Sequence, residues 1–172
     1  MFRLLPFGVG LGCLAQVGCS LILDFSDKQI PIDAPPDVFT VAECSFAEPN
    51  DTFETAVAQT VGTPGMAALC ADGAQDKDFY KFTVPAATVS LTAKLEFTNL
   101  AGDLDLYLYD STGIELSRSV SNRDNEQIVC PGAAPVCALG MTPPIPEGDY
   151  VLEVRSLAGV QNTYAIDVTL GM

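Results

Sequence analysis

The stretch from Gly102 to Asp110, GDLDLYLYD, brings together side chains that could do chemistry. Asp103 and Asp105 lie two residues apart, so both would project from one face of a strand. A glycosidase needs its two carboxyl groups on either side of the bond that it breaks, and neighbours on one strand do not provide this arrangement. We therefore expect the two aspartates to be structural, accepting hydrogen bonds from groups beside the strand.

The absence of histidine excludes whole classes of enzyme. A chain without histidine cannot use Ser-His-Asp or Cys-His catalysis, and it cannot form the usual catalytic zinc sites. The net charge of −14 argues against nucleic acid as a partner, because phosphate binding needs clustered Lys and Arg. Acidic side chains can supply oxygen ligands to hard cations, or they can simply keep the surface solvated. We predict that the chain is not an enzyme.

The leucines of the same stretch indicate the element that carries it. Leu104, Leu106 and Leu108 alternate with polar and aromatic residues, which is typical of a strand with one face in the core and the other at the surface. Tyr107 and Tyr109 are predicted on the surface face. With Tyr150 they could form an aromatic patch for a peptide or sugar ligand. The alternative is that the tyrosines pack at the edge of the sandwich with solvated hydroxyls.

Similar strands are predicted on both sides of this one, about eight in all. In the clearest of them the odd-numbered residues from Val89 to Phe97 are expected to face inward, and Asp110 to Gly113 is expected to form a type I turn. The other strands are expected at 66–70, 79–84, 114–120, 127–130, 150–155 and 164–170. Short alternating strands separated by turn signals predict an antiparallel β-sandwich.

The N-terminus is predicted to direct export. In residues 1–18 Arg3 precedes an apolar run without acidic residues, too short to cross a membrane, which is typical of a signal peptide. The run ends in LAQVGCS, which resembles the lipobox of bacterial lipoproteins. That resemblance implies that Cys19 carries lipid and anchors the chain in a membrane. The alternative is an ordinary signal peptide cut near Gly18, which would leave Cys19 as an unpaired thiol in a secreted protein.

The remainder is predicted to consist of a tether and one domain. Residues 19–43 contain acidic side chains and the prolines Pro31, Pro35 and Pro36, which favour an extended, solvated linker. Residues 44–172 form the predicted sandwich. Its four cysteines, at 44, 70, 130 and 137, are expected to form two disulfides in an exported chain, and three pairings are possible. The short CPGAAPVC loop favours Cys130 with Cys137, which leaves Cys44 with Cys70.

Four segments of the domain occur in order: AEPNDTFETA at 47–56, DKDFYKFTV at 76–84, GDLDLYLYDSTG at 102–113 and PEGDYVLEV at 146–154. Together they resemble the bacterial pre-peptidase C-terminal domain family. The resemblance implies a jelly-roll-like β-sandwich, usually appended to secreted proteases and other exported enzymes, that is itself non-catalytic. Some members bind calcium, or extracellular polymers such as collagen or polysaccharide. The chain departs from the family in an insertion at 130–145, and in having a lipoprotein-like signal where a catalytic domain would precede.

The same resemblance implies a calcium site. The matching positions are Glu48, Asn50 and Asp51 in the first segment, with Asp76 and Asp78 before the DFY strand. Ca²⁺ takes six to eight oxygens or so from carboxylates, amides and carbonyls. The alternative is that Asn50 and Asp51 only form an Asx turn or cap the residues that follow them.

These observations predict a non-catalytic binding module that is displayed as a lipoprotein of the bacterial envelope, in the outer membrane. The alternative location is outside the cell, as a secreted protein. The module's expected partners are the membrane, through the lipid anchor, and an extracellular protein or polysaccharide. Ca²⁺ would be a structural ligand. The alternative function is a purely structural envelope lipoprotein without a soluble ligand.

Overall fold

Nine β-strands form most of the part of the chain that the structure describes. The computed structural model describes residues 44, 48–70, 76–132, 137, 144–156 and 159–172, which all belong to the unit Val38–Met172. The predicted signal peptide, Cys19 and the predicted tether lie outside these residues. None of the helices among the described residues has the length and apolarity to cross a membrane.

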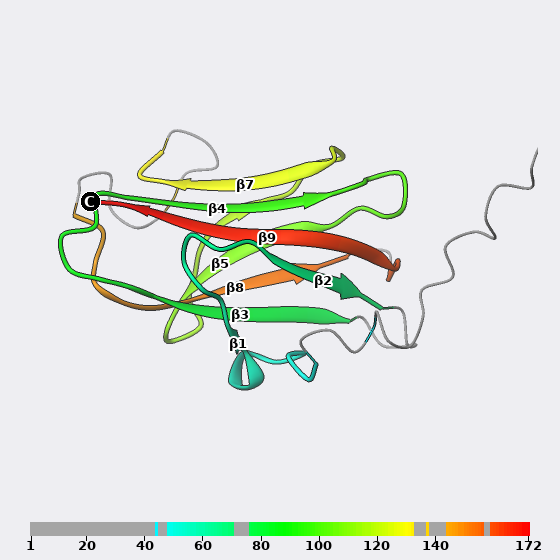
Figure 1. Ribbon diagram of the computed structural model, residues 1–172, viewed down its shortest axis with the longest axis horizontal. Helices are drawn as coiled ribbons and strands as arrows, with labels where there is room; N and C mark the ends of the chain where they lie inside the picture. The colour runs from blue at the N-terminus through cyan, green and yellow to red at the C-terminus, as the bar shows by residue number, and fades with distance from the viewer. Residues whose placement is uncertain (1–43, 45–47, 71–75, 133–136, 138–143, 157–158) are drawn as a thin grey trace, which may run out of the picture. The chain divides into compact units, whose positions relative to one another are not determined.

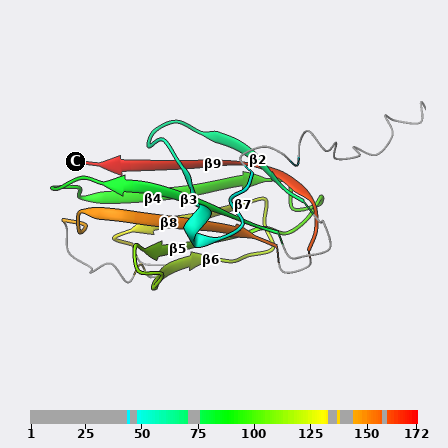
Figure 2. The same ribbon diagram turned by 90° about the horizontal axis from the view of Figure 1, so that it is seen from below.

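The strands divide into two sheets that lie face to face (Figures 1 and 2). In chain order they are β1 (Val57–Ala58), β2 (Gly65–Leu69), β3 (Lys77–Val84), β4 (Ser90–Phe97), β5 (Asp105–Asp110), β6 (Glu115–Ser119), β7 (Asn125–Cys130), β8 (Gly148–Arg155) and β9 (Asn162–Gly171). One sheet has the order β1-β3-β8-β5-β6 and the other has the order β2-β9-β4-β7. All neighbours are antiparallel except the short parallel pair β1 and β3. A single turn of 3-10 helix, η1 (Phe53–Thr55), precedes β1.

The core lies between the sheets and follows the predicted alternation. Leu91, Ala93 and Leu95 of β4 are fully buried, as are Leu106 and Leu108 of β5 on the opposite sheet. Removing this apolar surface from water is the main favourable contribution to folding. Because side chains alternate between the two faces of a strand, each strand packs one face in the core. The predicted all-β sandwich is confirmed.

The structure differs from the predicted strands at their ends. The sandwich has nine strands rather than about eight because β1 was not predicted, and its two residues are too few to show a period-two pattern. Val89 was predicted to face inward but exposes 41% of its surface. It precedes Ser90, the first paired residue of β4, and its N–H donates to the Gly171 carbonyl at the end of β9. The side chain therefore lies at the end of the sandwich, outside the core.

Two disulfides join the predicted cysteines: Cys44 with Cys70, and Cys130 with Cys137. The first attaches the segment before η1 to the end of β2, and the second closes a loop after β7. Bridges of this kind contribute about 2–4 kcal/mol each. Because disulfides persist in oxidising compartments, they place the domain outside the cytoplasm.

Candidate metal centre

The segment Glu48–Asp51 lies along the beginning of β3. The N–H of Phe79 donates to the Asn50 carbonyl at 2.9 Å, and the N–H of Asn50 donates to Glu48 Oε2 at 3.2 Å. The next residue, Thr52, caps η1 by accepting a hydrogen bond from the N–H of Thr55. The cap is therefore Thr52, and the side chains of Asn50 and Asp51 do not serve as one.

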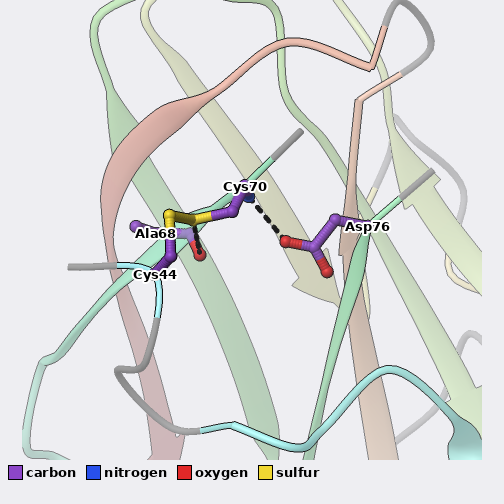
Figure 3. Close-up of a disulfide and its surroundings, with 4 residues drawn as sticks. All are labelled: Cys44, Ala68, Cys70 and Asp76. Atoms are coloured by element: carbon purple, nitrogen blue, oxygen red, sulfur yellow. Dashed lines mark hydrogen bonds between the residues drawn. A yellow bond between two sulfur atoms is a disulfide. The ribbon is translucent and has the colours of Figure 1, made fainter. Parts of the chain in front are cut away.

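Three carboxylates meet at this place. One oxygen each from Glu48, Asp51 and Asp76 lie within 4.8 Å of one another. Asp51 is exposed, while the other two side chains are half-buried. Asp76 is held in place by the N–H of Cys70, which donates to Asp76 Oδ2 at 2.6 Å (Figure 3). Three of the five residues that were expected to bind a metal are thus within reach of a single ion.

The other two expected residues, Asn50 and Asp78, are buried behind the carboxylates. Asn50 is 0% exposed and Asp78 is 1% exposed. One terminal atom of the Asn50 amide lies 3.1 Å from Glu48 Oε2 and 3.0 Å from Asp78 Oδ1. That atom is assigned as the nitrogen, because a nitrogen there donates to both carboxylates, whereas an oxygen would face only acceptors.

Two tyrosines in the interior hold Asp78. The hydroxyl of Tyr164, in β9, donates to Asp78 Oδ2, and the hydroxyls of Tyr80 and Tyr164 lie 2.6 Å apart. Asp78 and Tyr80 belong to β3 in the other sheet, so this chain of hydrogen bonds crosses the core. The predicted strands at 79–84 and 164–170 include both tyrosines, but no pattern in the sequence connects them with Asp78. A signal was present, since a buried tyrosine hydroxyl in an apolar stripe needs a polar partner.

Burial and the negative charges of neighbouring carboxylates raise the pKa of two carboxyl groups in this cluster. Desolvation raises the pKa of Asp78 to about 8, and the neighbouring charges of Asp76, Glu48 and Asp51 add to the rise, while the hydrogen bond from Tyr164 opposes it. Burial also raises the pKa of Glu48, with further contributions from Asp51 and Asp76. The fold therefore holds these carboxyl groups together against their mutual repulsion, and a bound cation would relieve that repulsion.

The tyrosines that were expected to form a ligand patch do not share a surface. Tyr107 is 3% exposed and its ring lies under the guanidinium of Arg155, 3.7 Å from the ring centroid. Tyr109 is half-buried on the same face, and its hydroxyl donates to Glu153. Tyr150 points into the core on the other face of the sheet, where it stacks on Phe82. The predicted patch of three tyrosines is wrong, because neighbouring side chains cover the outer face of β5 and Tyr150 faces the core.

Asp103 and Asp105 also differ from expectation. Asp103 Oδ1 and Asp105 Oδ2 are buried and accept no hydrogen bond within the described part of the chain. Burial raises the pKa of Asp105 to about 6, and Asp103 and Glu126 add to the rise. Asp110 at the end of β5 does accept hydrogen bonds from loop amides: its Oδ1 accepts from the N–H groups of Thr112 and Ile114 in the turn.

Known proteins are similar to this chain over its β-sandwich. Residues 76–156 match the model of the bacterial pre-peptidase C-terminal domain. The solved pre-peptidase C-terminal domain of a collagenase from Bacillus anthracis is 16% identical with a TM-score of 0.50, and the match covers 66% of this chain and 93% of that one. PliG from Aeromonas hydrophila, a periplasmic inhibitor of g-type lysozyme, is 11% identical with a TM-score of 0.41, covering 67% of this chain and 96% of that one. No curated protein matches the sequence.

The matched residues run from Asp76 to the end of β8 and include Asp78, whereas Glu48, Asn50 and Asp51 precede them. At 16% identity the likeness to the collagenase domain is one of fold. The domains of this family are non-catalytic accessory domains. Over residues 76–156 the chain is thus similar to the bacterial pre-peptidase C-terminal domain family.

Proposed function

We propose that the chain is a non-catalytic, extracytoplasmic binding module whose N-terminal segment is fastened to the sandwich by Ca²⁺. The observation that carries the calcium proposal is the convergence of three carboxylates: one oxygen each from Glu48, Asp51 and Asp76 lie within 4.8 Å of one another. Ca²⁺ suits this set because it takes several oxygen ligands in irregular geometry, whereas Mg²⁺ requires a near-ideal octahedron.

The buried Asn50 behind the carboxylates supports this role. Its amide nitrogen donates to Glu48 Oε2 at 3.1 Å and to Asp78 Oδ1 at 3.0 Å. It therefore fixes the Glu48 carboxylate beside those of Asp51 and Asp76. When bound there, a cation would supply positive charge to oxygens that otherwise repel one another.

Calcium is expected to raise the melting temperature of the full chain. At a concentration 100 times the Kd, a ligand of the native state adds about 2.7 kcal/mol, which corresponds to a rise of about 5–10 °C for a domain of this size. Thermal unfolding at neutral pH in EDTA, in CaCl₂ and in MgCl₂ measures this rise. Asp51→Asn should reduce the calcium-dependent part because Asp51 is one of the clustered carboxylates.

Glu54→Gln is the matched control, since Glu54 is an exposed acid three residues further along that is not part of the cluster. It should respond to calcium as the wild-type chain does. A melting temperature that is the same in EDTA and in CaCl₂ would exclude the site.

The ligand proposed for the module is a macromolecule, either an extracellular protein or a polysaccharide. Two surface hollows have volumes of about 230 and 270 Å³, below the ~300–1,000 Å³ of typical small-molecule pockets. The first is lined by Pro64, Lys94, Glu96, Ala165 and Asp167 on the outer face of β4 and β9. Hollows of this size on a sheet face suit an extended partner better than an enclosed small molecule.

The proposed location is the bacterial envelope, with Cys19 carrying the lipid. The support is the lipobox-like LAQVGCS motif, together with the disulfides, which require an oxidising compartment. Mass spectrometry of the exported full-length product should find an N-terminal peptide that begins at Cys19 and carries acyl chains. Cys19→Ser should abolish the acyl mass and release the protein from membranes. A mature wild-type chain without lipid would show that it is secreted instead.

A further inference from the structure

The disulfide between Cys44 and Cys70 lies beside Asp76, one of the carboxylates of the candidate metal centre (Figure 3). Cys70 follows the last residue of β2, and its N–H donates to Asp76 Oδ2 at 2.6 Å. Cys44 precedes Glu48 by only four residues. One side of the bridge thus positions one of the clustered carboxylates, and the other side holds the segment that brings two more.

The segment Glu48–Asp51 is fixed to the sandwich from both directions. The bridge fixes the chain before it, and the hydrogen bond from the N–H of Phe79 to the Asn50 carbonyl fixes its middle on β3. Against these attachments stand the like charges of Glu48, Asp51 and Asp76, whose oxygens share a space of 4.8 Å. Without the bridge, the segment could move away and separate these charges; with it, they stay together whether or not a cation is present.

We propose that the Cys44–Cys70 bridge and the cation stabilise each other: the bridge preorganises the ligands for Ca²⁺, and bound Ca²⁺ protects the bridge from reduction. This inference rests on the calcium site of the proposed function. Linkage is reciprocal, so the factor by which the bridge raises the affinity for Ca²⁺ equals the factor by which saturating Ca²⁺ disfavours reduction of the bridge. Preorganisation raises affinity because the ordering of the segment no longer has to be supplied by the ion.

The redox step is a thiol–disulfide exchange with a dithiol. A thiolate of the dithiol attacks one sulfur of the bridge, the bond between Cys44 and Cys70 breaks, and a mixed disulfide forms. The second thiol of the dithiol then displaces the protein sulfur and closes an intramolecular disulfide. In total two electrons and two protons pass from the dithiol to the protein, which ends with two thiols.

The second bridge provides a matched control within the same chain. Cys130 pairs in register with Leu91 at the beginning of β4, whereas Phe97 at the other end of β4 pairs with Tyr164 beside the metal centre. The Cys130–Cys137 bridge therefore lies at the opposite end of the sheet from Asp78. Calcium should leave its reduction unchanged.

Two measurements on the full chain test the linkage. Calorimetric titration with CaCl₂ compares the wild type with the double variants Cys44→Ser/Cys70→Ser and Cys130→Ser/Cys137→Ser. Equilibration of the wild type in buffers of reduced and oxidised dithiothreitol, with and without CaCl₂, followed by alkylation and peptide mass spectrometry, reports each bridge separately. We expect about a tenfold loss of calcium affinity in the first variant only. We also expect calcium to lower the equilibrium constant for reduction of Cys44–Cys70 about tenfold, and to leave that of Cys130–Cys137 unchanged. A tenfold change corresponds to about 30 mV in the reduction potential of a two-electron couple.

The outcomes separate this inference from the proposed function. If oxidised wild-type chain does not bind Ca²⁺, the calcium site and the linkage both fail. The linkage is wrong and the calcium site stands if the oxidised chain binds Ca²⁺ with an affinity that is the same without the bridge. In that case the reduction of the bridge is also the same with and without the ion. If the Cys44→Ser/Cys70→Ser variant does not fold, the reduction equilibrium of the wild type decides the question.

Discussion

Tyr164→Phe is expected to lower the free energy of unfolding by about 2–3 kcal/mol, because the buried carboxyl group of Asp78 and the buried hydroxyl of Tyr80 lose their hydrogen-bond partner. The Tyr164 hydroxyl is the donor to Asp78 Oδ2 and also contacts the Tyr80 hydroxyl, and all three side chains are buried. Phenylalanine fills the same space, so no cavity contributes to the loss. It leaves two polar groups without a partner in a region that water does not reach.

Urea denaturation of the wild type and the variant in EDTA measures this loss. Tyr150→Phe is the control, since Tyr150 is another buried tyrosine of the sandwich but donates to the carbonyl of Pro146, a neutral acceptor. Its loss should be about 1 kcal/mol. Equal losses in the two variants would show that the bond to Asp78 has no special weight. In CaCl₂ the Tyr164 variant should also gain less stability than the wild type, because Asp78 is no longer oriented by its donor.

Glu153→Gln is expected to cost about 2 kcal/mol, because it removes the buried charge that pairs with Lys77 and Arg155 on the outer side of β8. Glu153 is buried, its Oε1 lies 3.2 Å from Lys77 Nζ and 3.4 Å from an Arg155 nitrogen, and its Oε2 accepts from the Tyr109 hydroxyl at 2.6 Å. Lys77 and Arg155 remain partly exposed, so water will screen part of the effect and keep the loss below that of a fully buried pair.

The control is Glu96→Gln, which removes an exposed partner of Lys94 on the other sheet. Exposed pairs of this kind contribute at most about 1 kcal/mol. Denaturation in low and high salt measures both variants. If Glu153→Gln costs no more than Glu96→Gln, the cluster around Glu153 is held by packing of Tyr107 and Tyr109 rather than by charge.

The alternation of apolar and polar residues predicted which faces of the strands are buried, but not where the strands begin. The run from Ser90 to Phe97 showed a period of two over its whole length, and the structure forms β4 there. The same pattern could not show where pairing begins, so Val89 was assigned to the core although it precedes the first pair. In β5 the pattern separated Leu106 and Leu108 from Tyr107 correctly, but it could not show that Arg155 covers Tyr107 on the outer face.

The candidate site was predicted in part. The five positions implied by the family resemblance came from two segments separated by 24 residues, and the structure brings the carboxylates of Glu48, Asp51 and Asp76 together. It adds what the resemblance did not include: Asn50 and Asp78 are buried, and Tyr80 and Tyr164 complete their hydrogen bonds.

The fold class, the absence of histidine-based catalysis and the cysteines that pair could all be predicted from the sequence. These depend on composition and on local patterns, namely a period of two, turn residues and the short loop between Cys130 and Cys137. The tertiary structure alone decided which side chains are buried on the outer face of β5 and which groups surround Asp78. Its donor, Tyr164, lies 86 residues away in the other sheet. A local pattern tells which residues share a face, but the neighbours that cover that face come from distant parts of the chain, and only folding brings them there.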